Sequence, residues 1–427
     1  MPNAARVALT VAVGIVFAIL VAAHVPGVNG PDYWQWAWQR RSDVVLLVFF
    51  FLVAASPALV AQRVRSRAGM LALLGLSVIL LQFTGNQLQP RDHGVARIDR
   101  LAHDQLQTSY YTVAESIARA KDIDWLGQYD QLLRLAPQHA TTKPPGPVAF
   151  YLALIRLAGP MHAPLVIAIA ISLLSACAVV AMWWMARTIS GDDDVALQAA
   201  TLLALAPSMT LFFLYLDPVY PLFSCALLAT WWKATRRSAV LFGLILFAAT
   251  MTSYTLLVLG VALAGMTLPR LRQRVTWELV GIALGVALAA HVLFALVTGF
   301  NPLSGFRTAL AMQAYQLPLL HRPWPRTIPF DLLDFLLGAG WVPLAPAVLW
   351  VARRRDVTVW MLLTPLVVAL TGLIQAETAR VWSFLLPLLL FPAACELRQW
   401  SRLQRLAVHG SMLVVLVALY ANMVFLA

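Results

Sequence analysis

The sequence predicts an all-α, polytopic membrane protein with about thirteen transmembrane helices. Of the 427 residues, 61% are hydrophobic and 12% are charged, and the mean hydropathy is +0.76. A soluble domain carries roughly 25% charged residues, so water would not solvate this chain. Apolar stretches of about 20 residues, the length that one helical span needs, recur from end to end. Together these observations exclude a soluble enzyme.

The charge balance predicts membrane lipids as partners rather than nucleic acid. The formal net charge is +12, which in a soluble protein would suggest a nucleic-acid partner. In a membrane protein, arginines mark cytoplasmic loops and attract anionic headgroups. Cys177, Cys225 and Cys395 lie in apolar stretches without metal-ligand spacing, so we interpret them as core residues. No cofactor and no required metal are expected.

The spans can be placed from the apolar stretches. The first one, up to His24, is longer than the apolar part of a usual signal peptide and is interpreted as a retained span. The predicted spans lie at residues 5–23, 43–62, 68–84, 163–186, 195–214, 218–234, 239–252, 254–269, 276–298, 330–352, 357–374, 382–396 and 407–426.

Arginine clusters predict the orientation of these spans. If the N-terminus is cytoplasmic, the clusters that begin at Arg63, Arg270, Arg353 and Arg398 all fall in loops on one side. The positive-inside rule makes that side cytoplasmic. We therefore expect a multi-pass protein of the cell inner or plasma membrane, with an active site on the outer face.

The chain is expected to divide into an N-terminal hairpin (1–67), a catalytic module (68–298) and a C-terminal region (299–427). The module includes a large outer loop at 85–147, and the C-terminal region includes a second outer loop at 299–329. Within the large loop, residues 110–118 and 125–133 have the i, i+3, i+4 apolar spacing of amphipathic helices. Two short helices on the membrane surface are the expected result.

The large outer loop carries three aspartates, Asp92, Asp99 and Asp104, ahead of the first of these helices. An aspartate near a helix N-terminus often caps backbone N–H groups. The functional alternative is a general base that takes the proton from an acceptor hydroxyl. The sequence alone leaves both interpretations open for each residue.

The same loop ends in His139-Ala-Thr-Thr-Lys143-Pro-Pro-Gly-Pro147 and runs directly into an apolar segment. The prolines fix the angle of the chain at the membrane surface. Lys143 would then lie at headgroup depth, where it could meet a phosphate. The alternative is a lysine that extends its amine to the interface for solvation only.

Two further charged sites lie in predicted outer turns. Glu377 and Arg380 are three residues apart, so on a helix they share a face and form either a structural ion pair or part of a cavity. Asp217, in Leu216-Asp217-Pro218, is either an exposed loop carboxylate or a second acid of the site.

The order of these motifs resembles the GT-C superfamily of membrane glycosyltransferases. An outer acidic residue precedes a tyrosine-bearing surface helix, and a Lys-Pro-Pro turn and an apolar run follow. The nearest likeness is to protein O-mannosyltransferases and lipid A aminoarabinose transferases. The Thr252-Ser-Tyr-Thr255 segment resembles their Thr-Lys-Tyr turn with serine in place of lysine. Asp104-Gln105 stands where those enzymes have Asp-Glu, and the first two spans are an additional hairpin.

The resemblance implies an inverting transfer of a sugar from a polyprenyl-phosphate donor to a glycan, lipid or protein acceptor. It implies Asp104 as the base, with Asp99 in reserve, and Lys143 at the donor phosphate. Arg380 joins Lys143 by the physical argument alone. The remaining substrate-binding candidates are His139, Asp217, Tyr110 and Glu377.

Three alternatives remain open at this stage. A polysaccharide polymerase or ligase would also act on lipid-linked glycans, although such enzymes usually have their large loop late in the chain. A transporter would show two similar halves and charged residues deep in its spans, whereas His291 is the main such residue here. A non-enzymatic assembly protein is the third alternative.

Overall fold

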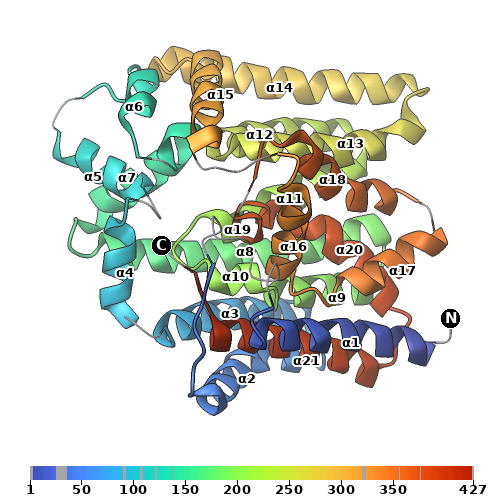
Figure 1. The fold of residues 1–427 in the computed structure, drawn as a ribbon. Helices are drawn as coiled ribbons and strands as arrows, with labels where there is room; N and C mark the ends of the chain where they lie inside the picture. The colour runs from blue at the N-terminus through green and yellow to red at the C-terminus, as the bar shows by residue number, and fades with distance from the viewer. Residues whose placement is uncertain are drawn as a thin grey trace.

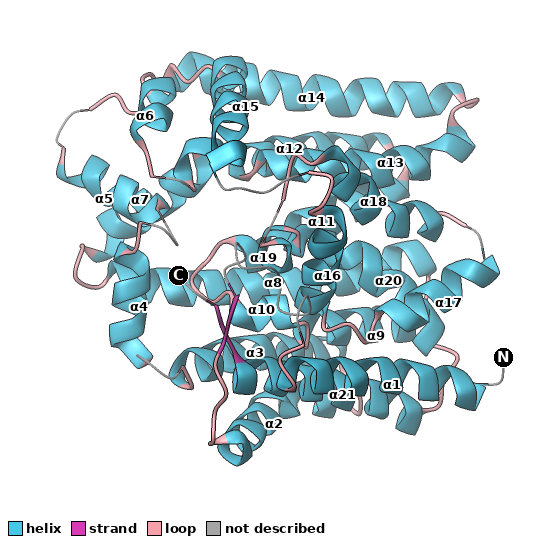
Figure 2. Ribbon diagram, in the orientation of Figure 1, coloured by secondary structure: helices cyan, strands magenta, loops and turns pink. Residues whose placement is uncertain are grey.

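The computed structural model describes residues 3–25, 36–89, 93–105, 109–120, 123–137, 139–319, 324–354, 356–375 and 377–425. These residues are mostly helical, and the long helices α1, α14 and α21 run along one common direction (Figure 1). The all-α prediction is therefore confirmed. Figure 2 shows the one exception among the described residues, a short pair of strands.

Six helices among the described residues are long and apolar enough to cross a membrane, and each coincides with a predicted span. They are α1 (Asn3–Ala22), α2 (Val44–Ala61), α3 (Arg67–Gln87), α8 (Ala163–Ser190), α14 (Arg274–Thr298) and α21 (Arg402–Asn422).

Shorter helices occupy the other predicted spans. They are α9 (Asp193–Ala204), α10 (Pro207–Leu211), α11 (Tyr220–Lys233), α12 (Arg236–Thr252), η3 (Tyr254–Leu259), α13 (Gly260–Thr267), η4 (Leu268–Arg270), α16 (Ile328–Ala339), α17 (Leu344–Arg354), α18 (Thr358–Thr371), η5 (Ser383–Leu385) and α20 (Leu386–Leu397).

Two of the predicted spans are broken rather than continuous. The span at 195–214 divides into α9 and α10, and Pro207 begins the second piece. The span at 330–352 bends by 106° between α16 and α17. Gly340 ends α16 with a φ of +84°, a conformation in which glycine meets no Cβ penalty. The apolar run of the sequence does not reveal this bend, because hydropathy carries no information on chain direction.

The predicted outer loop at 85–147 contains α4 (Gly94–His103), α5 (Tyr110–Arg119), α6 (Tyr129–Leu135) and η1 (Ala140–Thr142). Helix α5 coincides with the first predicted amphipathic helix. Helix α6 covers only the second half of the other, because residues 125–128 form turns, and α4 is an additional helix. The loop ends at α7 (Gly146–Ala158), the apolar run after the Lys-Pro-Pro turn. Figure 1 shows α4, α5 and α6 at one end of the helix bundle.

The second outer segment, 299–329, is helical over much of its length as α15 (Pro302–Leu319). It packs on α6 through Ser304, whose hydroxyl donates to the Asp130 carboxylate. Strands β1 (Trp36–Trp38) and β2 (Met423–Phe425) pair antiparallel with Trp38 opposite Met423. This pairing joins the end of the chain to the tip of the N-terminal hairpin.

The burial pattern fits a bundle whose apolar outer surface faces lipid. Helix α20 is buried over all of its length, whereas α14 leaves Leu288, Leu296 and Val297 between 66% and 80% exposed. In water such an apolar surface would be unfavourable, but in a bilayer it needs no cover. The predicted polytopic membrane protein is therefore confirmed in its class. The division at residues 67 and 298 stays a prediction.

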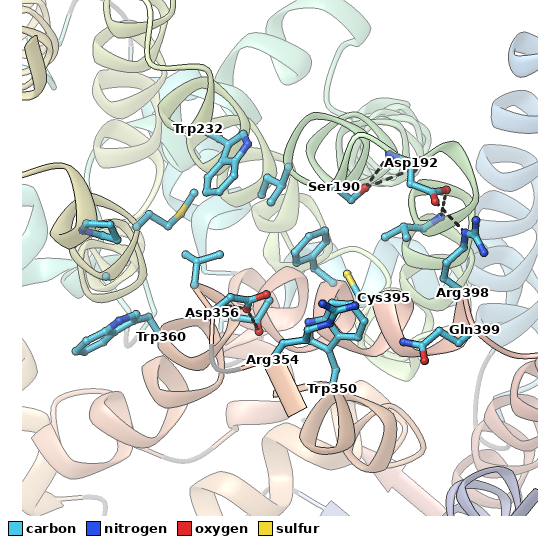
Figure 3. A pocket seen from close by; sticks show the side chains of 18 of the residues that line it. Ser190, Asp192, Trp232, Trp350, Arg354, Asp356, Trp360, Cys395, Arg398 and Gln399 are labelled. Carbon is cyan, nitrogen blue, oxygen red and sulfur yellow. Dashed lines mark hydrogen bonds and ion pairs between the residues drawn. The ribbon is translucent and has the colours of Figure 1, made fainter. Parts of the chain in front are cut away.

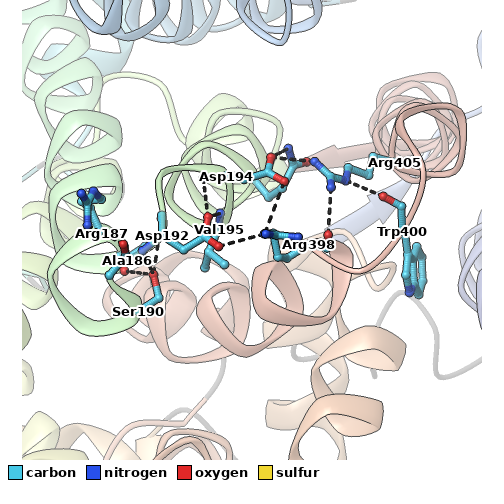
Figure 4. Close-up of polar contacts among 11 residues, drawn as sticks. Ala186, Arg187, Ser190, Asp192, Asp194, Val195, Arg398, Trp400 and Arg405 are labelled. Carbon is cyan, nitrogen blue, oxygen red and sulfur yellow. Dashed lines mark hydrogen bonds and ion pairs between the residues drawn. The ribbon is translucent and has the colours of Figure 1, made fainter.

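The loops that carry the arginine clusters meet at one end of the bundle. There the aspartates at the start of α9 pair with Arg187 at the end of α8 and with arginines from two other connections: Arg67 and Arg187 with Asp193, Arg398 with Asp192, and Arg405 with Asp194. Figure 4 shows how Asp192, Asp194, Arg398 and Arg405 face one another. These ion pairs explain why clusters far apart in the sequence lie together.

Candidate active site

A cavity of about 310 Å³, the Lys143 cavity, brings together six of the eight predicted site residues. These are Tyr110, His139, Lys143, Asp217, Glu377 and Arg380. They come from segments as far apart as α5, the turn before α7, the 3₁₀ helix η2 (Asp217–Val219) and the short helix α19 (Thr378–Val381). The fold therefore assembles the cavity from turns at one end of the bundle.

Lys143 is held by its neighbours on both its backbone and its amine. Its carbonyl accepts a hydrogen bond of 2.9 Å from the Tyr129 hydroxyl, which ties it to α6. Its Nζ donates to the Ser253 hydroxyl at 3.1 Å and lies 5.9 Å from the centre of the Tyr220 ring. The Lys-Pro-Pro turn and the Thr252–Thr255 segment, which both resemble GT-C motifs, are therefore in direct contact.

Gly146 makes this contact possible. A Cβ at Gly146 would lie 2.1 Å from the carbonyl oxygen of Met251, at the end of α12. Real Cβ atoms do not approach backbone oxygen so closely, so the turn after Lys143 requires glycine at this position. The close approach of α7 to α12 is what brings Lys143 within reach of Ser253.

The environment shifts the protonation of two groups in the cavity. Burial lowers the pKa of Lys143 to about 8, and the nearby Asp217 carboxylate opposes that shift. Burial raises the pKa of Asp217, while the Arg380 and Lys143 charges oppose it. Desolvation is the larger cause in both cases. A carboxyl whose pKa is raised toward neutrality is a better proton acceptor in general-base catalysis.

Arg380 lies between two carboxylates and an aromatic ring. Its guanidinium donates to Glu377, lies 3.9 Å from the Asp217 carboxylate and lies 4.6 Å from the Tyr215 ring centre. The Arg380 and Glu377 side chains are each 5% exposed. Burial disfavours the charged guanidinium, but Glu377 and Asp217 outweigh it and hold the pKa of Arg380 above its usual value. Arg380 is therefore a permanent cation inside the cavity.

The turn that carries Arg380 is fixed by α16. The Asp334 carboxylate accepts hydrogen bonds from the Ala379 N–H at 2.8 Å and from the Thr378 hydroxyl at 3.3 Å. Glu377 has a φ of +51°, a left-handed conformation that costs a residue with a Cβ roughly 1–3 kcal/mol. Such conformations persist where the surroundings fix them, and they cluster at functional sites.

The two candidate bases of the outer loop lie elsewhere. Asp104 follows the last turn of α4, and its carboxylate is 3.9 Å from the Arg100 guanidinium. Asp99 is a largely exposed side chain of α4, 3.6 Å from the His103 ring. Neither lines the Lys143 cavity. The assignment of Asp104 or Asp99 as base stays a prediction, and Asp92 lies outside the described residues.

Comparisons with known proteins identify the fold. No protein-family model matches the sequence, and no curated protein sequence matches it significantly. The structure is similar to the crystal structure of ArnT from Cupriavidus metallidurans in the apo state, with a TM-score of 0.51 and 16% sequence identity. The match covers 78% of this chain and 60% of the ArnT chain. ArnT has the GT-C fold.

This chain has a GT-C fold. The resemblance inferred from the order of the motifs is therefore confirmed at the level of fold. The similarity extends over less than two thirds of the ArnT chain.

Several polar groups that line the Lys143 cavity are not among the predicted site residues. Tyr215, Gln313, Gln316 and Gln375 also line it, and Gln316 donates to the Thr141 hydroxyl at 2.8 Å. Gln313 and Gln316 belong to α15, which closes the cavity from the second outer segment. Their one sequence signal is the i, i+3 spacing of the two glutamines, which lies within a helix that also contains Ser304, Arg307 and Thr308.

The cavity combines a charged region with an apolar wall. Lys143 and Arg380 contribute two positive charges, and Asp217 and Glu377 contribute two carboxylates. The apolar wall consists of Leu257, Val258, Leu310, Leu373 and Ile374. Within the described residues, no group of three His, Cys, Asp or Glu side chains is placed to hold a metal ion. The expectation that no metal is required stays a prediction.

Proposed function

We propose that the protein is a membrane glycosyltransferase that moves a sugar from a polyprenyl-phosphate carrier to an acceptor hydroxyl at the outer face. The observation that carries this proposal is a single cavity in which two cations and a carboxylate lie beside an apolar wall. The cations suit a phosphate, the carboxylate suits a hydroxyl proton, and the wall suits a polyprenyl chain. The GT-C fold supports the same reaction class.

In the proposed reaction, Asp217 accepts the proton of the acceptor hydroxyl as its oxygen attacks the anomeric carbon. The bond from that carbon to the phosphate oxygen breaks, and its electron pair leaves with the polyprenyl phosphate. Lys143 and Arg380 stabilise the charge that develops on the phosphate. Attack opposite to the leaving group inverts the configuration at the anomeric carbon.

The geometry favours Asp217 over Asp104 and Asp99 as the base. Asp217 lies in the cavity with Lys143 and Arg380. A base must stand within about 3 Å of the hydroxyl that it deprotonates, so a cavity carboxylate is the better candidate. Tyr110, His139 and Glu377 are the proposed contacts to the sugar or acceptor, because they line the same cavity.

The outer location of the reaction is part of the proposal. The arginine-bearing loops gather at the end of the bundle opposite α4, α5 and α6 (Figure 1). The positive-inside rule makes that end cytoplasmic. The Lys143 cavity then opens toward the outer face of the cell inner or plasma membrane.

The decisive experiment does not require the sugar to be known. Purified protein is titrated with polyprenyl monophosphate, the carrier that all such donors share, and with polyprenyl diphosphate. Tighter binding of the monophosphate, together with its release from one member of a panel of polyprenyl-phosphate sugars, would support the proposal.

Preference for the diphosphate would instead favour a polymerase or ligase that acts on lipid-linked glycans. Failure to bind either carrier would contradict the proposed function.

A further inference from the structure

A second and larger cavity, the Trp350 pocket, lies at the other end of the bundle. Its volume is about 800 Å³. Helix α18 links the two cavities, because Trp360 near its start lines this pocket and Leu373 just beyond its end lines the Lys143 cavity. At 1.5 Å per residue, this helix separates them by about 20 Å. The Trp350 pocket is therefore distinct from the candidate active site.

Three tryptophans surround this pocket. Figure 3 shows Trp232, Trp350 and Trp360 around the space, with Arg354 and Arg398 at its edge. Tryptophan is enriched at membrane–water interfaces, where its ring meets the acyl region and its N–H meets polar groups. The Trp350 ring N–H has no hydrogen-bond partner among the described residues.

Some of the charged groups of the pocket are already used in ion pairs or hydrogen bonds within the protein. The Arg398 guanidinium donates to Asp192 at 2.8 Å and lies 3.8 Å from Asp194, as Figure 4 also shows. The Asp356 carboxylate accepts from the N–H of Thr358 at 2.9 Å and from the Thr358 hydroxyl. Through these contacts, Arg398, Asp192 and Asp356 hold neighbouring segments of the protein together, so we do not assign them to ligand binding.

Arg270 and Arg354 are different. Within the described part of the chain, neither guanidinium has a carboxylate within salt-bridge distance. Each instead lies over a tryptophan ring, Arg270 at 4.9 Å from the centre of Trp232 and Arg354 at 5.3 Å from the centre of Trp350. One Nη of Arg270 also donates to the Trp232 carbonyl at 3.5 Å. Stacking orients a guanidinium and leaves its remaining N–H groups available to an anion. Two oriented cations thus line one cavity.

We propose that the Trp350 pocket binds the phosphate headgroup of an anionic membrane lipid. Arginine donates two parallel hydrogen bonds to phosphate oxygens. Basic pockets between transmembrane helices are suited to lipid headgroups. The two arginines without carboxylate partners provide the charge complementarity.

The surroundings favour a lipid over a soluble phosphate compound. Leu268 and Leu271, which flank Arg270, are 47% and 37% exposed, and Trp360 is 38% exposed. Met266 and Val357 add apolar surface to the lining. Acyl chains would cover these side chains next to the headgroup, whereas a small soluble anion would leave them uncovered.

The test is lipid binding by the full chain in detergent, measured by native mass spectrometry. Phosphatidylglycerol is compared with phosphatidylcholine of the same acyl chains. Wild-type protein is expected to prefer phosphatidylglycerol. The Arg270→Gln/Arg354→Gln variant is expected to bind it about tenfold less tightly or weaker, because one charge-assisted contact corresponds to roughly that factor.

The matched control is Arg272→Gln/Arg274→Gln. These two arginines are exposed, lie within four residues of Arg270 along the chain and do not line the pocket. Both double variants lose the same net charge. Retention of the lipid preference in the control and its loss in the pocket variant would support the proposal. Equal loss in both would overturn it, since general attraction to a basic surface would then explain the binding.

Two further measurements remove the remaining ambiguity. If millimolar inorganic phosphate displaces phosphatidylglycerol, the pocket takes soluble phosphate compounds and the lipid assignment is overturned. If the double variant unfolds, the single Arg354→Gln variant replaces it, because Arg354 is exposed and its loss opens no cavity. Unchanged lipid preference in that folded variant would count against the proposal.

Discussion

The Lys143 cavity and the Trp350 pocket lie at opposite ends of one bundle, and both combine arginine with aromatic rings. They differ in how the charges are balanced. In the Lys143 cavity, Arg380 is buried between Glu377 and Asp217. In the Trp350 pocket, Arg270 and Arg354 lie over tryptophan rings and have no carboxylate partner among the described residues.

This difference indicates two kinds of chemistry. Opposed charges inside a buried cavity can exchange partners and protons when a substrate enters, which suits catalysis. Cations stacked on aromatic rings without carboxylates keep their charge and orientation, which suits steady binding of an anion. Arginine and aromatic residues therefore suit catalysis in the Lys143 cavity and stable binding of an anion in the Trp350 pocket.

The largest expected effect concerns the base. We expect Asp217→Asn to lower the rate of sugar transfer by about 10²–10⁴, because an amide cannot take the acceptor proton. Asp104→Asn and Asp99→Asn are expected to lower it less. The measurement is single-turnover transfer by each purified variant with saturating donor. If Asp104→Asn has the larger effect, the base belongs to the outer loop and Asp217 to binding.

Donor binding provides the second test. Lys143→Met should weaken binding of polyprenyl monophosphate by about 10- to 100-fold, since a hydrogen bond to a charged group contributes about 1.5–3 kcal/mol. The matched control is Lys233→Met, because Lys233 also lies over an aromatic ring, Trp184, but far from the cavity. Titration calorimetry would measure both. Equal weakening would mean that Lys143 has no specific role.

Two closely packed glycines, one beside each cavity, allow the Lys143 cavity and the Trp350 pocket to be perturbed separately. A Cβ at Gly338 would lie 2.5 Å from the Ala379 carbonyl in the turn before Arg380. A Cβ at Gly265 would lie 2.1 Å from the Trp360 ring. Each alanine variant should lose about 1–3 kcal/mol of stability. Gly338→Ala should lower the rate of sugar transfer and leave the preference for phosphatidylglycerol unchanged. Gly265→Ala should weaken that lipid preference and leave the transfer rate unchanged. Identical effects on both readouts would show that the two cavities are coupled.

The lowered pKa of Lys143 predicts a pH dependence of donor binding. Below pH 8 the amine is protonated and can bind phosphate, and above about pH 8 it loses its charge. Affinity for polyprenyl monophosphate should therefore fall as pH rises from 7 to 9, by a few-fold to tenfold. Lys143→Arg should abolish this fall in calorimetry at both pH values. A wild-type affinity that is constant across this range would exclude a titrating Lys143.

The smallest expected effect lies in the Trp350 pocket. Arg270→Gln/Arg354→Gln should change the transfer rate by less than about twofold, because these residues are separated from the Lys143 cavity by the length of α18. The assay is transfer in detergent, where lipid supply does not limit the rate. A loss comparable to that of Lys143→Met would mean that the pocket belongs to the reaction.

Much of the site could be predicted from the sequence because its residues lie in turns with distinctive chemistry. The proline-locked turn at Lys143 and the Glu377–Arg380 pair stand out against apolar surroundings, and both line the cavity. The glutamines of α15 did not stand out, since a polar residue in an outer segment is ordinary. The position of Asp104 relative to the cavity could not be predicted, because it depends on how α4 and α5 fold back on the bundle.

The sequence by itself determined the class of the protein, the course of its long apolar helices and the segregation of its arginines, because these follow from local composition and from the cost of charge in lipid. The tertiary structure decided which distant turns meet. Gly146 against Met251 brings Lys143 to Ser253, and Gly338 against Ala379 brings Asp334 to the turn that holds Arg380. Such contacts depend on packing between helices far apart in the chain, and no local pattern encodes them.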